Sequence, residues 1–123
     1  MKNQIKKIGV MTSGGDSPGM NAAIRSVVRA CAFHDIECYG IYRGYEGMIE
    51  GGFVKMDARS VKGIINKGGT ILKSARSKEF RKKEGRIKAH EQLKKAGIDA
   101  FVVVGGDGSF TGAMIFNQEF GFP

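Results

Sequence analysis

The chain has 123 residues, the usual length of one domain and enough to bury a hydrophobic core. Its composition, 41% hydrophobic and 26% charged, is typical of a soluble globular protein and argues against a disordered or fibrous one. The net charge of +8 raises the possibility of nucleic acid as a partner. However, the basic stretch over 73–95 contains only one aromatic residue, Phe80, whereas nucleic-acid modules interleave several. We therefore interpret this stretch as a solvated helix face with phosphate-binding residues at its edge, and expect no nucleic-acid partner.

No segment of the sequence resembles a secretion signal or a membrane span. The apolar run behind the basic start ends at Met11 and is too short for either. The two cysteines, Cys31 and Cys38, fall on an apolar helix stripe and inside a strand-like run, so we expect both to be small buried residues. With no disulfide framework and no secretion signal, we expect a cytoplasmic protein without a membrane partner.

The first half of the chain is predicted to form two strands on either side of an amphipathic helix. Residues 6–12 and 37–42 are apolar runs typical of buried strands. The helix begins at Ser17-Pro18, because serine can cap a helix and proline suits its first turn. Its apolar residues recur at helical spacing and form one stripe: Met20, Ala23, Ile24, Val27, Val28 and Cys31. A loop over 43–47 is predicted to follow the second strand.

The second half is predicted to continue the alternation of strands and helices. Its predicted elements are a short strand over 53–56, a helix over 60–67, an extended segment over 70–76, a helix over 82–96, a strand over 100–104 and a helix over 109–120. This order predicts an α/β fold, a doubly wound and mostly parallel sheet with helices on both faces. Such a fold normally returns from its last helix into a strand, so we expect the chain to be an incomplete piece of a larger protein.

Two segments repeat one pattern, in which Gly-Gly-Asp follows an apolar strand and precedes a helix. The first is Gly14-Gly15-Asp16 after residues 8–13, and the second is Gly105-Gly106-Asp107 after residues 101–104. Glycines at the end of a strand let backbone N–H groups approach a phosphate, and the helix N-terminus adds positive potential. An aspartate in such a loop suits a phosphate only when a divalent cation lies between them. The pattern predicts a nucleotide polyphosphate bound from two sides, at the sheet edge where the loop over 43–47 also lies.

The commoner phosphate and metal motifs are absent from the sequence. Residues 14–19 have the glycine spacing of a P-loop without its lysine, and residues 106–111 begin a dinucleotide fingerprint whose last glycine is replaced by Thr111. The two cysteines and the two distant histidines, His34 and His90, do not have zinc-ligand spacing. We expect His34 at a helix end and His90 partly exposed on a helix, neither of them catalytic.

The residues around these glycines carry a family resemblance. The stretch over 8–25, IGVMTSGGDSPGMNAAIR, resembles the amino-terminal signature of the 6-phosphofructokinases. The resemblance continues over 40–45, 66–70, 74–76 and 104–109, and it covers essentially the whole chain. NAD kinases and lipid kinases have a sequence that resembles Gly-Gly-Asp-Gly-Ser, so this motif alone does not identify the family. The stretch Gly-Met-Asn-Ala-Ala-Ile distinguishes the phosphofructokinases from both groups.

The resemblance implies a glycolytic kinase that transfers a phosphoryl group from ATP to fructose 6-phosphate with Mg²⁺. Residues 1–123 would be the amino-terminal part of its nucleotide-binding domain. The implied ATP contacts are Gly15 at the γ-phosphate, Tyr45 at the base, Arg76 and Ser77 at the transferring phosphate, and Gly106, Asp107, Gly108 and Ser109 around the phosphates. Asp107 would approach the metal directly or through water, and Arg76 would stabilise transition-state charge. The alternatives are a surface ion pair for Arg76 and turn geometry alone for the glycines.

One residue bears on the phosphate donor. Glycine at position 108 resembles the ATP-using members of the family, whereas aspartate there is typical of the pyrophosphate-using ones. An anionic side chain would crowd the path of the α-phosphate of ATP. We therefore expect an ATP-dependent enzyme and keep a pyrophosphate-dependent phosphofructokinase as an alternative.

The resemblance weakens at the allosteric site of bacterial relatives. Arg25 and Arg29 lie one turn apart off the apolar stripe and match arginines that bind a phosphorylated effector, with a solvated helix face as the alternative. Ala58 and Gly63 replace an arginine and an acidic residue of that site. We expect altered or absent activation by a nucleoside diphosphate, which titration of a full-length form with ADP would test. Ser77 likewise replaces an aromatic residue common beside the arginine.

The resemblance also implies features that the sequence does not contain. The family's catalytic aspartate lies in a segment just after residue 123, and its sugar-phosphate site is built from a later domain and a neighbouring subunit. We expect the full-length form to be a homotetramer. We therefore expect this chain alone to hold part of an ATP site without phosphorylating fructose 6-phosphate. A non-catalytic nucleotide-binding module is the remaining alternative.

Overall fold

The fold is taken from a computed structural model, which describes residues 5–12, 20–57, 59–61, 72, 79–105 and 107–122. In chain order the elements are β1 (Lys7–Thr12), α1 (Met20–Phe33), β2 (Glu37–Ile41), α2 (Gly44–Glu50), β3 (Phe53–Met56), the 3-10 helix η2 (Glu79–Arg81), α3 (Lys83–Ala96), β4 (Ala100–Val104) and α4 (Asp107–Phe120). The predicted strands over 53–56 and 100–104 are confirmed to the residue. Those over 6–12 and 37–42 and the helix over 82–96 are confirmed within one residue, and the last helix begins two residues earlier than predicted.

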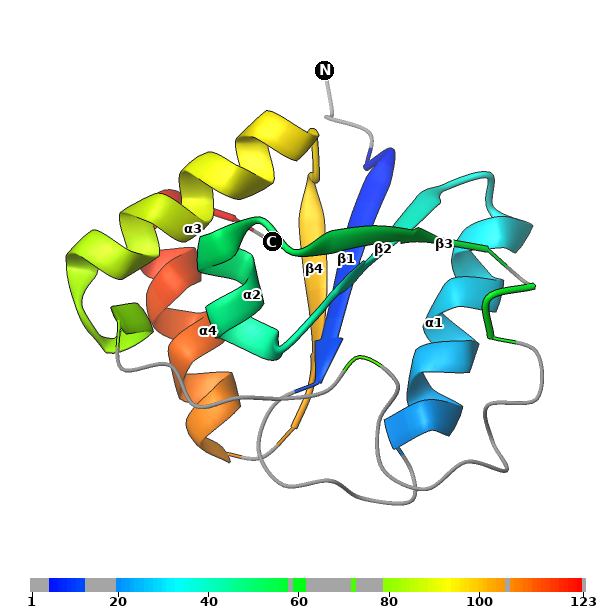
Figure 1. The fold of residues 1–123 in the computed structure, drawn as a ribbon, viewed down its shortest axis with the longest axis horizontal. Helices are drawn as coiled ribbons and strands as arrows, with labels where there is room; N and C mark the ends of the chain where they lie inside the picture. The colour runs from blue at the N-terminus through cyan, green and yellow to red at the C-terminus, as the bar shows by residue number, and fades with distance from the viewer. Residues whose placement is uncertain are drawn as a thin grey trace.

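Four strands form one sheet in the order β3-β2-β1-β4. β1 pairs in parallel with both β2 and β4, and only β3 runs antiparallel, so the prediction of a mostly parallel sheet is confirmed. Figure 1 shows α1 on one side of the sheet and α2, α3 and α4 on the other. The fold is therefore a three-layer α/β/α arrangement, as predicted for an incomplete doubly wound domain.

Alternating side chains of the strands supply a separate core to each face. Val10 packs with Ile24 and Val28 of α1, in a cluster whose other buried members are Cys31, Cys38, Met56, Val61 and Leu72. Met11, the next residue of β1, packs on the opposite face with Leu93 of α3 and Phe116 of α4. The expectation that Cys31 and Cys38 are buried is confirmed, since they are 4% and 2% exposed.

The predicted loop over 43–47 is wrong, because helix α2 begins at Gly44. Arg43 and Gly44 both have left-handed backbone angles, with φ of 66° and 61°, and they turn the chain from β2 directly into the helix. Gly47 allows this close approach, because a Cβ there would lie 1.5 Å from the carbonyl oxygen of Tyr42. The signal for a helix was the apolar spacing of Tyr45, Met48 and Ile49.

Several predictions fall on residues that the structure does not describe. The predicted helix start at 17–18, most of the helix over 60–67 and nearly all of the extended segment over 70–76 lie outside the described ranges. Within those ranges, no helix combines the length and the apolar character that crossing a membrane requires.

Candidate nucleotide-binding site

The carboxyl ends of the two central parallel strands lie side by side. Thr12, the last residue of β1, pairs with Val104, the last residue of β4. From β1 the chain moves to one side through α1 to β2, and it later returns to the opposite side of β1 to form β4. The strand order therefore reverses between β1 and β4, which in open α/β sheets is where ligands bind, outside the carboxyl ends. Each of these two strands is followed in sequence by Gly-Gly-Asp.

The second of these segments leads directly into a helix. α4 begins at Asp107 and runs for 14 residues, so its N-terminus faces the same edge as the end of β4. Asp107, Gly108 and Ser109 form its first turn. Backbone N–H groups in the first turn of a helix have no partner within the helix, and together with the helix dipole they favour an anion. Of the predicted phosphate ligands, Gly15 and Gly106 lie outside the described residues.

Tyr45 is positioned at this edge by α2, which starts where β2 ends. Its side chain is only 7% exposed, and burial raises the pKa of its hydroxyl. The ring stacks on Phe80 of η2, with centroids 3.9 Å apart and planes 16° from parallel. A Cβ at Gly112 of α4 would lie 3.3 Å from the Tyr45 ring, so this glycine lets α4 pack closely against the tyrosine. The structure thus makes Tyr45 part of the core beside the strand ends.

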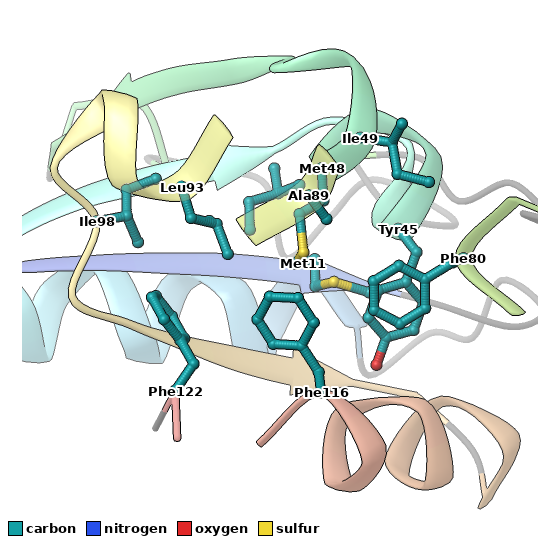
Figure 2. Close-up of a cluster of buried hydrophobic side chains, with 11 residues drawn as sticks. Met11, Tyr45, Met48, Ile49, Phe80, Ala89, Leu93, Ile98, Phe116 and Phe122 are labelled. Atoms are coloured by element: carbon teal, nitrogen blue, oxygen red, sulfur yellow. The ribbon is translucent and has the colours of Figure 1, made fainter. Parts of the chain in front are cut away.

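Figure 2 shows how this core cluster is arranged. The rings of Tyr45 and Phe80 lie beside each other at one end, and Ile98 and Phe122 lie at the other end, with Phe116 between the two ends. Ile98 stands just before β4, so this core extends toward the amino-terminal edge of the sheet.

A partly exposed ion pair lies next to this aromatic stack. Arg86 of α3 donates through Nε to Glu119 Oε1 at 2.6 Å and through Nη2 to Glu119 Oε2 at 3.0 Å. Its Nη1 donates to the carbonyl oxygens of Phe80 at 3.0 Å and Arg81 at 2.8 Å. The hydrogen bond from Arg86 lowers the pKa of the Glu119 carboxyl. The sequence had placed Arg86 on a solvated basic face, and a partner 33 positions away offers no local signal.

The structure leaves other predicted site residues untested. Arg76, Ser77, Ala58 and Gly63 lie outside the described residues. Arg25 and Arg29 lie one turn apart on α1, half-buried and exposed respectively. Their arrangement off the buried stripe is confirmed, whereas a role in binding an effector stays a prediction.

The histidines occupy the places that the sequence indicated. His34 follows the last residue of α1 and is exposed, and His90 is half-buried on α3. His90 stacks on Phe120 of α4, with centroids 4.4 Å apart. Burial, with Lys94 nearby, lowers the pKa of His90, so its ring is held as a neutral aromatic surface near neutral pH.

The fold and this edge define an α/β protein with a doubly wound, mostly parallel sheet. The family model described as phosphofructokinase matches residues 7–123, and the chain belongs to the phosphofructokinase family. It is 60% identical over 119 residues to the ATP-dependent 6-phosphofructokinase of Cytophaga hutchinsonii, a match that covers 97% of this chain and 36% of that protein. The corresponding enzyme of Oceanobacillus iheyensis is 59% identical, with 97% and 37% covered. This chain therefore spans little more than a third of those relatives.

Solved structures of the family have the same fold. Pichia pastoris phosphofructokinase in the T-state superposes with a TM-score of 0.91 at 46% identity, over 97% of this chain and 14% of that one. A pyrophosphate-dependent phosphofructokinase from Marinobacter aquaeolei superposes with a TM-score of 0.81 at 21% identity, over 97% and 31%. The second likeness shows the fold alone.

Proposed function

We propose that this chain is the amino-terminal part of the nucleotide-binding domain of an ATP-dependent 6-phosphofructokinase. The observation that carries the proposal is the pairing of Thr12 with Val104, which brings together the ends of the two strands that precede Gly-Gly-Asp. The 60% identity to an ATP-dependent 6-phosphofructokinase supports it. The reaction of the whole enzyme would convert ATP and fructose 6-phosphate to ADP and fructose 1,6-bisphosphate, in the cytoplasm and in a homotetramer.

In the proposed site, residues that follow β1 and residues that follow β4 would contact different phosphates of ATP. The backbone at Gly15 would contact the γ-phosphate from the β1 side, and Gly106, Gly108 and Ser109 would bind the phosphates from the β4 side. Arg76, beside Ser77, would add positive charge as the phosphoryl group moves, which is what phosphoryl transfer requires of a protein more than covalent chemistry. Tyr45 would contact the base.

The donor set of the second segment suits magnesium. Asp107 would supply one carboxylate, and Ser109 would add a hydroxyl. Mg²⁺ prefers such hard oxygen ligands and typically binds through one or two carboxylates together with substrate phosphates and water. When bound, the ion would neutralise phosphate charge; Asp107 would orient it directly or through water.

Equilibrium titration of the chain with Mg-ATP and with Mg-pyrophosphate tests the proposal. We expect ATP to bind more tightly than pyrophosphate. Asp107→Asn should weaken ATP binding, whereas Asp35→Asn, a matched change in an exposed turn, should leave it unchanged. Gly108→Asp should weaken ATP binding as well, because it places an anionic side chain near the phosphates. Tighter binding of pyrophosphate would support the pyrophosphate-dependent alternative, and binding of neither would contradict the proposed function.

We also propose that control by a nucleoside diphosphate is altered or absent. Arg25 and Arg29 could contact a phosphorylated effector from α1, but the sequence has Ala58 and Gly63 where relatives often have arginine and an acidic residue. Titration of the full-length enzyme with ADP tests this, and strong activation would contradict it.

A further inference from the structure

The Arg86–Glu119 pair differs in construction from the other described ion pairs. The side chain of Arg86 is 12% exposed and that of Glu119 is 23% exposed. In the Lys55–Glu37 pair, the Lys55 side chain is 65% exposed and the Glu37 side chain 43%. Arg86 uses Nε and Nη2 for Glu119 and Nη1 for two backbone carbonyl groups. Bidentate, charge-assisted bonds of this kind fix geometry as well as adding energy. One side chain of α3 therefore joins α4 to η2.

The two carbonyl bonds act on a segment that has little support of its own. η2 is a three-residue 3-10 helix, a type of helix with poor internal hydrogen-bond geometry. Arg86 binds the carbonyl oxygens of Phe80 and Arg81 within it. The backbone position of Phe80 is thus set by Arg86, and Glu119 in turn sets the direction of the guanidinium.

The ring of Phe80 transmits this position to Tyr45. Phe80 is 5% exposed, and it stacks on Tyr45 with centroids 3.9 Å apart. Tyr45 also packs against Gly112 of α4, the helix that carries Glu119. The same pair of charges therefore holds Phe80, which covers one face of Tyr45, and ties it to the helix against which Tyr45 rests.

We propose that Arg86 and Glu119 are positioning residues for recognition of the nucleotide base, acting through Phe80 on Tyr45. This inference rests on the proposed nucleotide function, in which Tyr45 contacts the base. Loss of the pair removes the hydrogen bonds that anchor η2 and so loosens the Phe80 ring that is stacked on Tyr45. The phosphates, bound at the ends of β1 and β4, are not affected by that movement. The pair thus contributes to affinity for a nucleotide and not to affinity for a polyphosphate.

The test compares two ligands that differ by the nucleoside. Mg-ATP and Mg-tripolyphosphate are titrated into the wild-type chain, Arg86→Gln and Glu119→Gln, with Lys55→Gln as the control that removes a positive charge from an exposed pair. We expect the Arg86 and Glu119 variants to bind ATP about tenfold more weakly, a change of about 1.4 kcal/mol. Their affinity for tripolyphosphate should stay at the wild-type value, and Lys55→Gln should bind both ligands as the wild type does.

A second comparison separates positioning from a general structural role. Phe80→Leu should weaken ATP binding by a similar factor, and adding Arg86→Gln to it should weaken binding no further, because both changes act on one contact. Additive losses would overturn the inference, as would an equal loss of affinity for ATP and tripolyphosphate. If Arg86→Gln does not fold, Glu119→Gln, which keeps the size of the side chain, carries the same test.

The outcomes for the wild-type chain keep the two proposals apart. If it binds neither ligand, the proposed nucleotide function fails and this inference fails with it. If it binds ATP and both variants bind ATP equally well, only the positioning role of Arg86 and Glu119 is overturned.

Discussion

The two faces of the sheet are stabilised in different ways. The α1 face is a compact aliphatic and sulfur-containing core, with Ile24, Val28 and Cys31 against the strands. The opposite face is rich in aromatic rings and combines residues of α2, η2, α3 and α4. The aromatic face is also the one that reaches the predicted base site through Tyr45. We therefore expect changes in the buried residues of the aromatic face to affect stability and nucleotide binding together, and changes in the buried residues of the α1 face to affect stability alone.

The strongest way to break the aromatic face is to displace α2. In Gly47→Ala the added Cβ would lie 1.5 Å from the carbonyl oxygen of Tyr42, a backbone atom that cannot move aside cheaply. We expect a loss of about 4 kcal/mol or more in the free energy of unfolding, measured by urea denaturation. Gly52→Ala is the control, because its Cβ meets nothing closer than 3.6 Å. An equal loss in both variants would contradict the role assigned to Gly47.

The cores themselves differ in what one side chain contributes. Phe116 is 0% exposed and contacts the rings of Phe80, Phe101 and Phe120. Phe116→Ala should lower the free energy of unfolding by about 3–5 kcal/mol, whereas Ile24→Val on the α1 face should lower it by about 0.5–1.5 kcal/mol. Urea denaturation of both variants measures the two losses in free energy of unfolding. Losses of similar size would contradict the large contribution expected of the Phe116 ring.

The aromatic face should also make stability depend on pH. Burial lowers the pKa of His90 below its ordinary value of 6.5, so the unfolded chain binds a proton more readily than the folded one. The contribution of His90 is therefore present above pH 6.5 and is lost as the pH falls through its lower folded-state pKa.

Denaturation between pH 5 and 8 (a range that spans the ordinary pKa of histidine) measures this dependence. His90→Gln should flatten the profile between those limits. An unchanged slope in His90→Gln would show that other groups produce the dependence.

The smallest effect is expected at the edge of the sheet. Lys55 of β3 lies 3.4 Å from Glu37, and both side chains are well exposed. Lys55→Gln should change the free energy of unfolding by less than about 0.5 kcal/mol, because solvent and salt screen such pairs. A larger loss by urea denaturation would mean that this edge supports the α1 face.

The sequence predicted those parts of the fold that local patterns determine. The run of apolar residues over 100–104 and the helical spacing in 83–96 were sufficient for β4 and α3. α2 was missed because it is short and glycine-rich, and because two left-handed residues replace the usual loop before it. The antiparallel direction of β3 was not predicted either.

The candidate site was predicted only in part. The two Gly-Gly-Asp segments and Tyr45 were predicted because strand ends and motifs can be recognised in the sequence itself. The contacts around Tyr45 were not predicted, because Phe80 and Gly112 belong to other elements of the fold. The Arg86–Glu119 pair was not predicted either, because its two residues are 33 positions apart. Tertiary contacts of this kind leave no periodicity in the sequence, so only the folded chain reveals them.

The two thiols of the chain can report when α1 separates from the sheet. Cys31 and Cys38 are the only cysteines of the chain, and both belong to the core beneath α1. Burial raises the pKa of the Cys38 thiol to about 12 and also raises that of Cys31, so neither thiol reacts readily while it stays covered. Alkylating reagents would therefore label the chain at the rate at which α1 separates from the sheet. The local opening of one layer can thus be timed without a label engineered into the protein.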